Sequence, residues 1–492
     1  MSPPNSSLPT QEREENALSD NGERLNTIEE EANAHLSPAP FPRTRLELNR
    51  QVWNLAWPSV LTMLLQTINS LMDALFVGHL PNAAEALAAT GVGGGIIFLL
   101  VSLAMGISVG TTALVARFTG ARDEASAIEA VGQSLSLSAM LGLVFGIVAY
   151  FSRDLLVNLL LNSTKNPLAA QLCSQFLGMA LLASLPLFIL NVLQSSFRGI
   201  GDTRTPLLLT LAMVGLHIGL NFLLIEGRFG FPSMGVRGAG TAFALSNFWG
   251  CLLFGLALRR SPLAHAYRIE NLRPQLEWVQ RILKIGIPAS IQAIMRTLSM
   301  MAFTALIART VEGAAGVAAL QIGIRTEAFA FMPGFGYSVA ASALVGQSLG
   351  ARDPEHAERC GWAALGQSLI VMVVMGVIFY LFAPGIAAIF TSDLHVRQLG
   401  VDYLRINAFS EPFIALGMVL TGALQGAGDT VRPTYITLIS MWVIRMPLAI
   451  WLMFGLHQNS QGAWISMCVT TIVGGLMTLW LYKQGAWKKV KV

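Results

Sequence analysis

Two polar stretches of this chain have nearly the same sequence. Residues 198–206 read RGIGDTRTP, and residues 425–433 read QGAGDTVRP. Gly, Gly, Asp, Thr and Pro fall in the same columns of the two stretches, 227 residues apart. A chain that repeats one turn at this distance is expected to consist of two similar halves.

The residues of the first turn suit a junction between two helices. Gly199 and Gly201 can adopt the left-handed backbone conformation that ends a helix. Asp202 or Thr203 can cap the following helix, and Pro206 suits its first turn. We therefore interpret the repeat as a tight helical hairpin that marks equivalent places in the two halves, rather than as a substrate site.

The composition is that of a membrane protein. Of 492 residues, 53% are hydrophobic and only 12% are charged, whereas soluble domains carry about 25% charged residues. Apolar runs of roughly 20 residues, the length that crosses the hydrocarbon core as a helix, continue along the chain. They are too long and too continuously apolar for barrel strands. We predict an all-α polytopic membrane protein.

Twelve candidate transmembrane helices follow from these runs, six in each half. They cover residues 51–78, 87–115, 128–151, 169–197, 206–226, 238–258, 280–308, 316–346, 361–382, 398–424, 434–455 and 463–482.

Further repeats relate the two sets of six helices. The tetrapeptide GARD occupies residues 120–123 and again 350–353, an offset of 230 residues. Pro58 and Pro288 share that offset. Six helices followed by six with the same sense of insertion form a parallel repeat. Its pseudo-twofold axis runs along the membrane normal, and such repeats commonly enclose a transport path.

Polar stretches set the expected domain boundaries. Residues 1–45 are rich in Ser, Asn, Glu and Pro and are predicted to form a disordered tail. The first six-helix lobe is expected over 46–258, and the polar stretch 259–279 is its linker to the second lobe. Residues 280–492 form that lobe and a short basic C-terminal tail.

Lys and Arg residues near the helix ends predict the orientation. With the N-terminus in the cytoplasm, twenty of them, including Arg198, flank cytoplasmic ends and seven flank the opposite ends. We therefore expect an integral protein of the plasma (inner) membrane with both termini in the cytoplasm.

Together, these motifs resemble those of the multidrug and toxic compound extrusion (MATE) family. The resemblance rests on the GxGDT turns, the GARD pair, Pro58 and Pro288, and LMDALFVGHL at 71–80, and it covers about residues 50–483. FMPGFGYSVAASALVGQSLGA at 331–351 is most similar to the DinF-like branch. The resemblance implies a V-shaped, two-lobed antiporter. Such an antiporter expels organic cations or other amphipathic compounds by alternating access while protons or sodium ions run inward.

Asp73 is the acidic residue inside the first predicted span. An ionisable side chain at the centre of a span costs about 2.5–3.5 kcal/mol and therefore suggests a function. Apolar surroundings favour the neutral carboxyl group, which can exchange a proton, and the ionised form could bind sodium. The resemblance implies the same role, because DinF-like members couple transport at an Asp in this place. The alternative is an interfacial acid, since Gly78 lies only five residues further on.

Other polar residues of the first half are expected near Asp73. His217 and Asn221 are four residues apart and share a helix face. The family usually has Asn and then Asn or Asp at this pair, so His217 favours protons over sodium as the coupling ion. Thr241 matches a family position near the same cavity, so the resemblance counts it among the coupling residues, with a hydrogen bond that joins helices as the alternative. Three further residues either line the substrate cavity or join helices through hydrogen bonds: Gln66, Asn191 and Gln194.

The second half carries charges of its own inside predicted spans. Arg296 stands where the NorM branch has a glutamate that binds the coupling ion, so a NorM-type cation site is not expected. Glu327 is expected to neutralise Arg296 or Arg325 as a structural pair, with a role in substrate binding or gating as the alternative. The same two alternatives apply to Glu411 and Arg445.

Two functions remain open at this point. The first is a secondary antiporter that exports cationic or amphipathic compounds in exchange for protons or, second in rank, sodium. The second is a lipid-linked oligosaccharide flippase or a carrier of an endogenous metabolite, which the in-span arginines keep open. No metal, cofactor or nucleic acid is expected, and no nucleophile–base pair or Walker A motif indicates an enzyme. The expected partners are small-molecule substrates and membrane lipids, and we expect a monomer.

Overall fold

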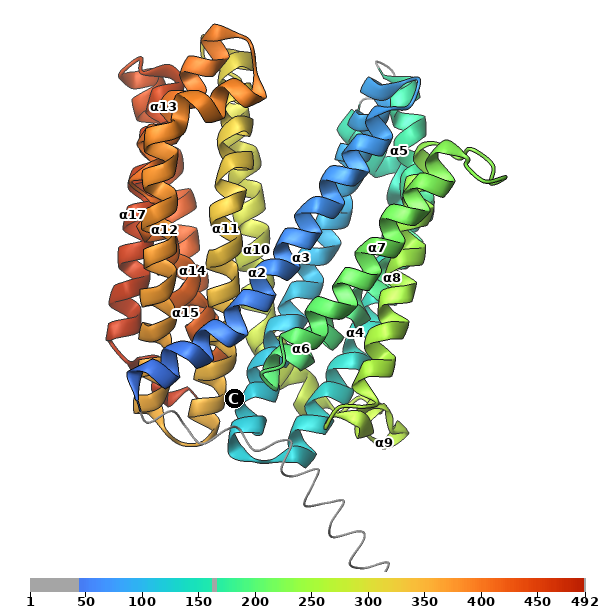
Figure 1. Cartoon of the computed structure of the whole chain (residues 1–492), viewed down its shortest axis with the longest axis vertical. Coiled ribbons are helices and arrows are strands. Elements are labelled where there is room, and N and C mark those ends of the chain that lie inside the picture. Colours follow the sequence, from blue (N-terminus) through green and yellow to red (C-terminus); the bar gives the residue numbers. More distant parts are fainter. Residues whose placement is uncertain (1–43, 162–165, 491–492) are drawn as a thin grey trace, which may run out of the picture. The chain divides into compact units, whose positions relative to one another are not determined.

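The computed structural model describes residues 44–161 and 166–490. These residues belong to the larger compact unit of the chain. The predicted tail, residues 1–45, lies almost entirely outside the described residues. All regular elements in the described ranges are helical (Figure 1).

The first group of helices, which we call the N-bundle, comes from the first half of the chain. Its members are α2 (Arg45–Gly78), α3 (Ala83–Ala121), α4 (Glu124–Leu161), α5 (Pro167–Ala180), the 3₁₀ turn η1 (Leu181–Ala183), α6 (Ser184–Gly199), α7 (Arg204–Glu226) and α8 (Val236–Leu258).

The second group, the C-bundle, follows a short connection. That connection contains η2 (Ala264–Tyr267) and α9 (Ile269–Leu272), so most of the predicted linker 259–279 lacks a long helix. The members of the C-bundle are α10 (Leu276–Ile307), α11 (Gly313–Gly350), α12 (Pro354–Phe390), α13 (Leu394–Ala408), α14 (Glu411–Gly426), α15 (Val431–Leu438), η3 (Ile439–Ile444), α16 (Arg445–Ile450), η4 (Trp451–Gly455), α17 (Asn459–Lys483) and η5 (Ala486–Lys489).

The predicted number of spans agrees with this arrangement. Eleven helical segments in the described ranges, with α5 to α6 taken as one, are long and apolar enough to cross a membrane. The tenth predicted span, residues 398–424, is instead a pair of helices, α13 and α14, bent by 57°. Counting this bent pair as one span gives twelve. The eleventh span contains two π-helical segments, η3 and η4, which apolar periodicity alone did not predict.

Helices from the two halves of the chain approach each other through pairs of small residues. Gly106 of α3 packs against Gly286 of α10, and Gly336 of α11 packs against Ala56 of α2. A Cβ atom on Gly106 would lie 2.5 Å from the Gly286 carbonyl oxygen, and one on Gly336 would lie 2.8 Å from the Ala56 carbonyl oxygen. The two contacts are related by the offset of 230 residues. The sequence repeat is therefore also a pseudo-twofold relation between helix contacts.

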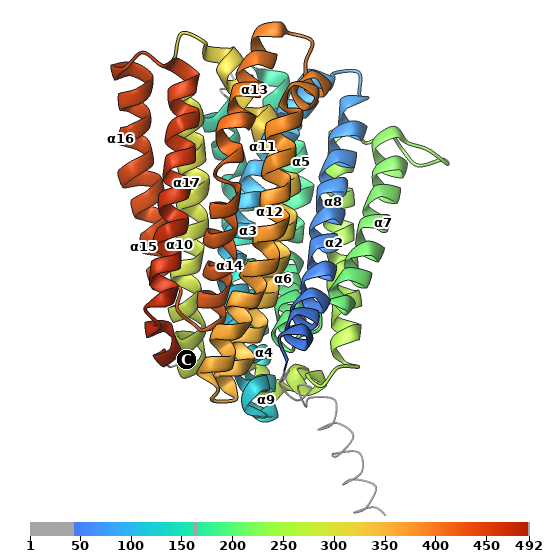
Figure 2. The ribbon, with the colours of Figure 1, turned by 60° about the vertical axis from the view of Figure 1, so that its left-hand side comes forward.

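These contacts lie toward one end of the helices, which we call the Arg45 end because α2 begins there. Within the described unit, the bundles meet near the Arg45 end and stand apart near the opposite, Gly78 end (Figure 1). A second view shows α10 and α15 beside each other, and α2 beside α7 (Figure 2). This is the V-shaped arrangement of two lobes that the resemblance implies.

Helices α2 and α10 each contribute to both bundles. Val52 and Ala56, in the first half of α2, belong to the apolar core of the C-bundle, and the second half of α2 packs on α7. In α10, Ile282 belongs to the core of the N-bundle and Phe303 to a core of the C-bundle. The lobes that the chain order defines therefore differ from the packing units by these exchanged half-helices.

The repeated turns have the same backbone conformation in both halves. Gly201 has a φ angle of 86° and Gly428 one of 85°. In the GARD segments, Arg122 and Arg352 have φ angles of 59° and 61°, which is uncommon for residues other than glycine. The repeat is thus preserved in unusual backbone geometry as well as in sequence.

Only part of the predicted turn chemistry is seen. Asp202 caps α7, because its Oδ1 accepts hydrogen bonds from the next two helical N–H groups, each 3.0 Å long. The side chain of Thr203 makes no capping hydrogen bond. Gly199 does not adopt the left-handed conformation that we expected. It lies inside α6, where its missing side chain lets it approach Val115 of α3, and its carbonyl oxygen accepts a hydrogen bond from Gln347 of the C-bundle.

Candidate functional site

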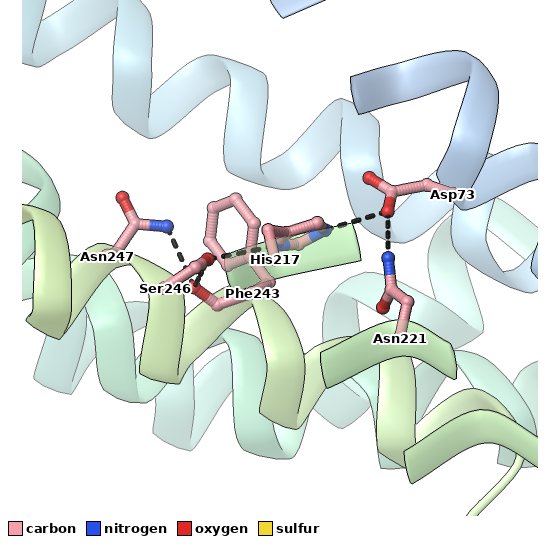
Figure 3. A network of polar contacts seen from close by, with 6 residues as sticks. All are labelled: Asp73, His217, Asn221, Phe243, Ser246 and Asn247. Atoms are coloured by element: carbon pink, nitrogen blue, oxygen red, sulfur yellow. Dashed lines mark hydrogen bonds and ion pairs between the residues drawn. The ribbon is translucent and has the colours of Figure 1, made fainter. Parts of the chain in front are cut away.

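Helix α7 presents His217 and Asn221 to Asp73 of α2 (Figure 3). The Nε2 atom of His217 lies 2.7 Å from Asp73 Oδ1, and Asn221 Nδ2 donates to the same oxygen over 2.5 Å. Both α7 residues are buried, at 3% and 0% exposed, whereas the Asp73 side chain is 37% exposed. The spacing of four residues places both groups on one carboxylate oxygen.

Ser246 of α8 completes this network on the other side of the imidazole. His217 Nδ1 lies 2.8 Å from Ser246 Oγ, and that hydroxyl donates to the Phe243 carbonyl oxygen over 3.0 Å. Phe243 also sets its ring edge-on to the imidazole, with the centroids 6.5 Å apart. We did not predict Ser246 from the sequence, because serine is common in apolar helices and nothing local relates it to α7.

The hydrogen count of this network has a chemical consequence. Since the Ser246 hydrogen is used for the Phe243 carbonyl, His217 must donate through Nδ1. The 2.7 Å contact between His217 Nε2 and Asp73 Oδ1 then needs one hydrogen, carried either by the imidazole or by the carboxyl group. If the Ser246 hydroxyl instead turns and donates to Nδ1, neutral His217 can donate through Nε2 to ionised Asp73. One hydroxyl rotation thus lets the network hold one proton more or fewer.

Asn221 leaves one polar atom without a partner. Its Oδ1 is buried and accepts no hydrogen bond from any described residue. Buried acceptors of this kind are usually satisfied by protein, water or an ion. Together with the Asp73 carboxylate, this amide oxygen is a ligand type that hard cations prefer.

A cavity of about 460 Å³ begins beside His217, and we call it the N-bundle cavity. His217 and Ser246 line it, whereas Asp73 is not among its lining residues. The imidazole therefore lies between the carboxylate and the cavity. The three residues predicted from the sequence to line a cavity are all in its wall: Gln66, Asn191 and Gln194.

Thr241 was expected near the same cavity but does not line it. Its hydroxyl donates to the Arg237 carbonyl oxygen of its own helix over 2.9 Å. The structure thus places Thr241 on α8 without a contact to the Asp73 network among the described hydrogen bonds. A matching position in the chain did not suffice to predict a place in the cavity wall.

Arg198, which we had assigned to a cytoplasmic helix end, stands in the last turn of α6 and also lines the N-bundle cavity. Its Nη2 donates to Ser108 Oγ over 3.2 Å. Gln425, the equivalent first residue of the second repeated turn, lines the same cavity. The repeated turn therefore contributes one side chain from each half to the cavity, although its aspartates act as caps.

A second cavity, of about 550 Å³, lies in the other bundle, and we call it the C-bundle cavity. Arg296, Glu327 and Arg445 line it. Met63 and Phe335 line both cavities, so the two are neighbours.

Glu327 was expected to neutralise Arg296 or Arg325, but the described residues show no ion pair between them. Its Oε1 accepts a hydrogen bond from the hydroxyl group of Tyr403 over 2.9 Å. Arg325 is exposed on α11 and lines neither cavity. Tyr403 was not predicted, because its contact with Glu327 depends on how α13 packs against α11.

The comparison with known proteins identifies the family. The MatE family model matches residues 58–223 and 288–451, two segments that begin 230 residues apart. The chain belongs to the MatE family. This confirms the resemblance to MATE transporters inferred from the repeated motifs, while the assignment to the DinF-like branch stays a prediction.

Proteins similar to this MATE transporter support the family assignment. A probable multidrug resistance protein NorM of Thermotoga maritima is 30% identical over 447 residues, which cover 90% of this chain and 94% of that protein. A probable multidrug resistance protein YoeA of Bacillus subtilis is 25% identical over 440 residues, with 88% and 93% covered. The chain is thus a transporter of the MATE multidrug efflux type.

Solved structures confirm the fold. A crystal structure of MATE in the straight conformation superposes with a TM-score of 0.82 at 25% identity, covering 90% of this chain and 97% of that one. A MOP superfamily transporter from Pyrococcus furiosus superposes with a TM-score of 0.83 at 23% identity, covering 92% of this chain and 100% of that one. The all-α fold of two six-helix lobes is therefore confirmed.

Proposed function

We propose that this protein exports cationic or amphipathic organic compounds in exchange for protons, and that Asp73 and His217 form the coupling site. The observation that carries the proposal is the hydrogen bond between His217 Nε2 and Asp73 Oδ1, in a network that can hold one proton more or fewer. The protein would act as a transporter and not as an enzyme. Both cavities and the coupling site lie within one chain, which supports a functional monomer.

The orientation in the membrane is part of the proposal. The excess of Lys and Arg favours the cytoplasm for the Arg45 end. Both described ends of the chain, the start of α2 and the end of α17, would then lie on the cytoplasmic side of the inner membrane. Since α3 of the N-bundle packs against α11 of the C-bundle near the Arg45 end, the described conformation would be closed toward the cytoplasm.

The position of His217 suggests how the uptake of a proton is linked to the release of substrate. In the outward-facing state Asp73 takes up a proton, and the hydrogen bonds with His217 and Asn221 rearrange. Because His217 also lines the N-bundle cavity, this rearrangement changes the cavity wall and favours substrate release. The inward-facing state then releases the proton and binds substrate again. The two states must bind the proton with different affinity for this exchange to work.

Sodium is the second candidate for the coupling ion. The observation that favours it is Asn221 Oδ1, a buried oxygen without a partner beside a carboxylate. Ionised Asp73 and this amide could provide two oxygen ligands. The imidazole beside them favours protons, because a histidine gains and loses a proton near neutral pH.

Transport into proteoliposomes with imposed ion gradients tests the proposal. Purified protein is reconstituted, and accumulation of an organic cation such as ethidium is measured with a proton gradient or a sodium gradient alone. We expect the proton gradient to drive transport and the sodium gradient to have no effect. Transport driven by sodium alone would assign the site to that ion, and transport that needs neither gradient would contradict the proposal.

A further inference from the structure

The charges in the wall of the C-bundle cavity are unbalanced. Among its lining residues only Arg296, Glu327 and Arg445 carry a charge, two positive and one negative. Both guanidinium-bearing residues line this one cavity. A cation in this cavity would meet a net positive wall, whereas an anionic group would be attracted.

Glu327 and Arg445 already have partners. Tyr403 donates to Glu327, as described above, and Arg445 donates through Nε to Thr470 Oγ1 over 2.9 Å and through Nη2 to Thr471 Oγ1 over 3.3 Å. These neutral partners hold the two side chains in place but do not cancel the net charge.

Arg296 differs from these residues. No hydrogen bond or ion pair joins its guanidinium group to another described residue, and its side chain is exposed toward the cavity. An arginine offers five N–H donors in a planar arrangement that matches carboxylate, sulfonate and phosphate groups. Arg296 therefore lines the cavity with donors that no described residue uses.

Glu411 does not restore the balance of charge. It is fully buried and is not among the residues that line the cavity. Neither of its carboxylate oxygens has a hydrogen-bond partner in the described ranges. An ionised carboxylate without partners is strongly disfavoured in such a place. Glu411 is therefore expected to be neutral.

The rest of the cavity wall suits the apolar part of a ligand. A volume of about 550 Å³ lies in the range of small-molecule sites. Methionine side chains adapt to different apolar shapes, and the wall contains several methionine and phenylalanine residues: Met300, Met332, Met418, Met441, Phe331 and Phe413.

The backbone near Arg445 has an unusual conformation. Arg445 begins α16 directly after η3, a π-helical segment whose Ser440 and Met441 line the cavity. Segments of π-helix are rare and occur frequently at functional sites. This observation is independent of the charges and points to the same cavity.

We propose that the C-bundle cavity is a binding subsite for the anionic group of an amphipathic substrate, with Arg296 as its principal ligand and Arg445 as its second cation. This inference rests on the proposed transport function and extends its substrate class. Zwitterionic and anionic amphipathic compounds are then substrates besides organic cations, and an anionic lipid headgroup has the same chemistry. The N-bundle site would carry the coupling ion while the C-bundle cavity binds the substrate anion.

The test is direct binding with two probes that differ in the sign of their charge. Naphthalene-1-sulfonate is the anion and trimethyl(naphthalen-1-yl)ammonium the cation, each measured by equilibrium dialysis against protein in phosphatidylcholine nanodiscs, with empty nanodiscs subtracted. We expect wild type to prefer the sulfonate. Arg296→Gln should weaken sulfonate binding at least about tenfold, as expected for the loss of a charge-assisted hydrogen bond, without weakening binding of the ammonium ion.

Two further variants control this result. Arg296→Lys keeps the charge and should retain sulfonate binding better than Arg296→Gln. Arg325→Gln removes a positive charge that lines neither cavity and should leave sulfonate binding unchanged. Equal sulfonate affinity in wild type and Arg296→Gln, or a wild-type preference for the ammonium ion, would overturn the proposal.

A competition experiment identifies the source of the anionic group. If short-chain phosphatidylglycerol displaces the sulfonate, the subsite accepts a lipid headgroup. If it does not, the subsite is selective for other amphipathic anions.

The subsite and the coupling mechanism can fail separately. Proton-driven transport with sulfonate binding that is insensitive to Arg296 would exclude the subsite and leave the coupling proposal intact. If sulfonate binding depends on Arg296 but a proton gradient does not drive transport, the coupling proposal is excluded and the subsite proposal stands.

Discussion

Replacing Asp73 by asparagine removes the proton site with little change in shape. The amide retains an oxygen at the Oδ1 position, which can still accept hydrogen bonds from His217 and Asn221. It cannot take up or release a proton. The variant should therefore fold and bind substrate, while the link between substrate and proton is lost.

The substrate gradient that the wild type can maintain follows from the exchange of one proton per transport cycle at the Asp73–His217 pair. A gradient of one pH unit supplies about 1.4 kcal/mol per proton, which corresponds to a factor of about ten in an equilibrium constant. Exchange of one proton for one substrate can therefore maintain about a tenfold substrate gradient. In Asp73→Asn the concentrations should become equal on the two sides.

The assay measures the final substrate ratio across proteoliposome membranes at an imposed gradient of one pH unit. The control is Asp154→Asn, which changes an exposed acid on α4 that is hydrogen-bonded to Ser174 and lies outside the coupling network. The control should reach the wild-type ratio. If Asp73→Asn also maintains a tenfold gradient, the reasoning is refuted.

Three other substitutions test separate parts of the structure. Ser246→Ala removes the hydroxyl partner of His217 Nδ1 and should lower proton-driven transport, because the network loses the hydroxyl rotation that lets it hold one proton more or fewer. Gly106→Val places atoms against the backbone of α10 and should lower the melting temperature and transport, whereas Gly94→Val, with open space around it, should not. Tyr403→Phe leaves Glu327 without its donor and should lower the stability by about 1–3 kcal/mol, measured by thermal unfolding in detergent.

Each of these expectations has a result that contradicts it. Wild-type proton-driven transport in Ser246→Ala would mean that its hydroxyl does not take part in coupling. Equal melting temperatures for Gly106→Val and Gly94→Val would mean that the contact between α3 and α10 is not tight. A wild-type melting curve for Tyr403→Phe would mean that the buried Glu327 has another partner.

The fold was largely predictable because the same sequence motifs occur in both halves of the chain. The offset between Pro58 and Pro288 gave the correct register, and the same offset relates the contacts Gly106–Gly286 and Ala56–Gly336. Apolar runs reveal membrane helices, but they do not reveal a bend or a π-helical turn. The break between α13 and α14 and the segment η3 were therefore missed.

The candidate site was predictable only along single helices. The spacing of His217 and Asn221 showed that they share a face, and Asp73 was recognisable as an acid in an apolar span. Ser246 could not be found in this way, because its contact depends on how α8 packs against α7. Arg198 was assigned only to a cytoplasmic helix end, because an arginine near a helix end usually follows the positive-inside rule. In the structure its long side chain extends into the N-bundle cavity.

The count of protons released on substrate binding tests the coupling claim most directly. Ethidium is added to the purified protein in weakly buffered solution, and the pH change is converted to protons per bound molecule. We predict about one proton per substrate for wild type, because two ligands that compete through one site must displace each other, and none for Asp73→Asn. Binding without proton release in wild type, or equal release in Asp73→Asn, would contradict the account.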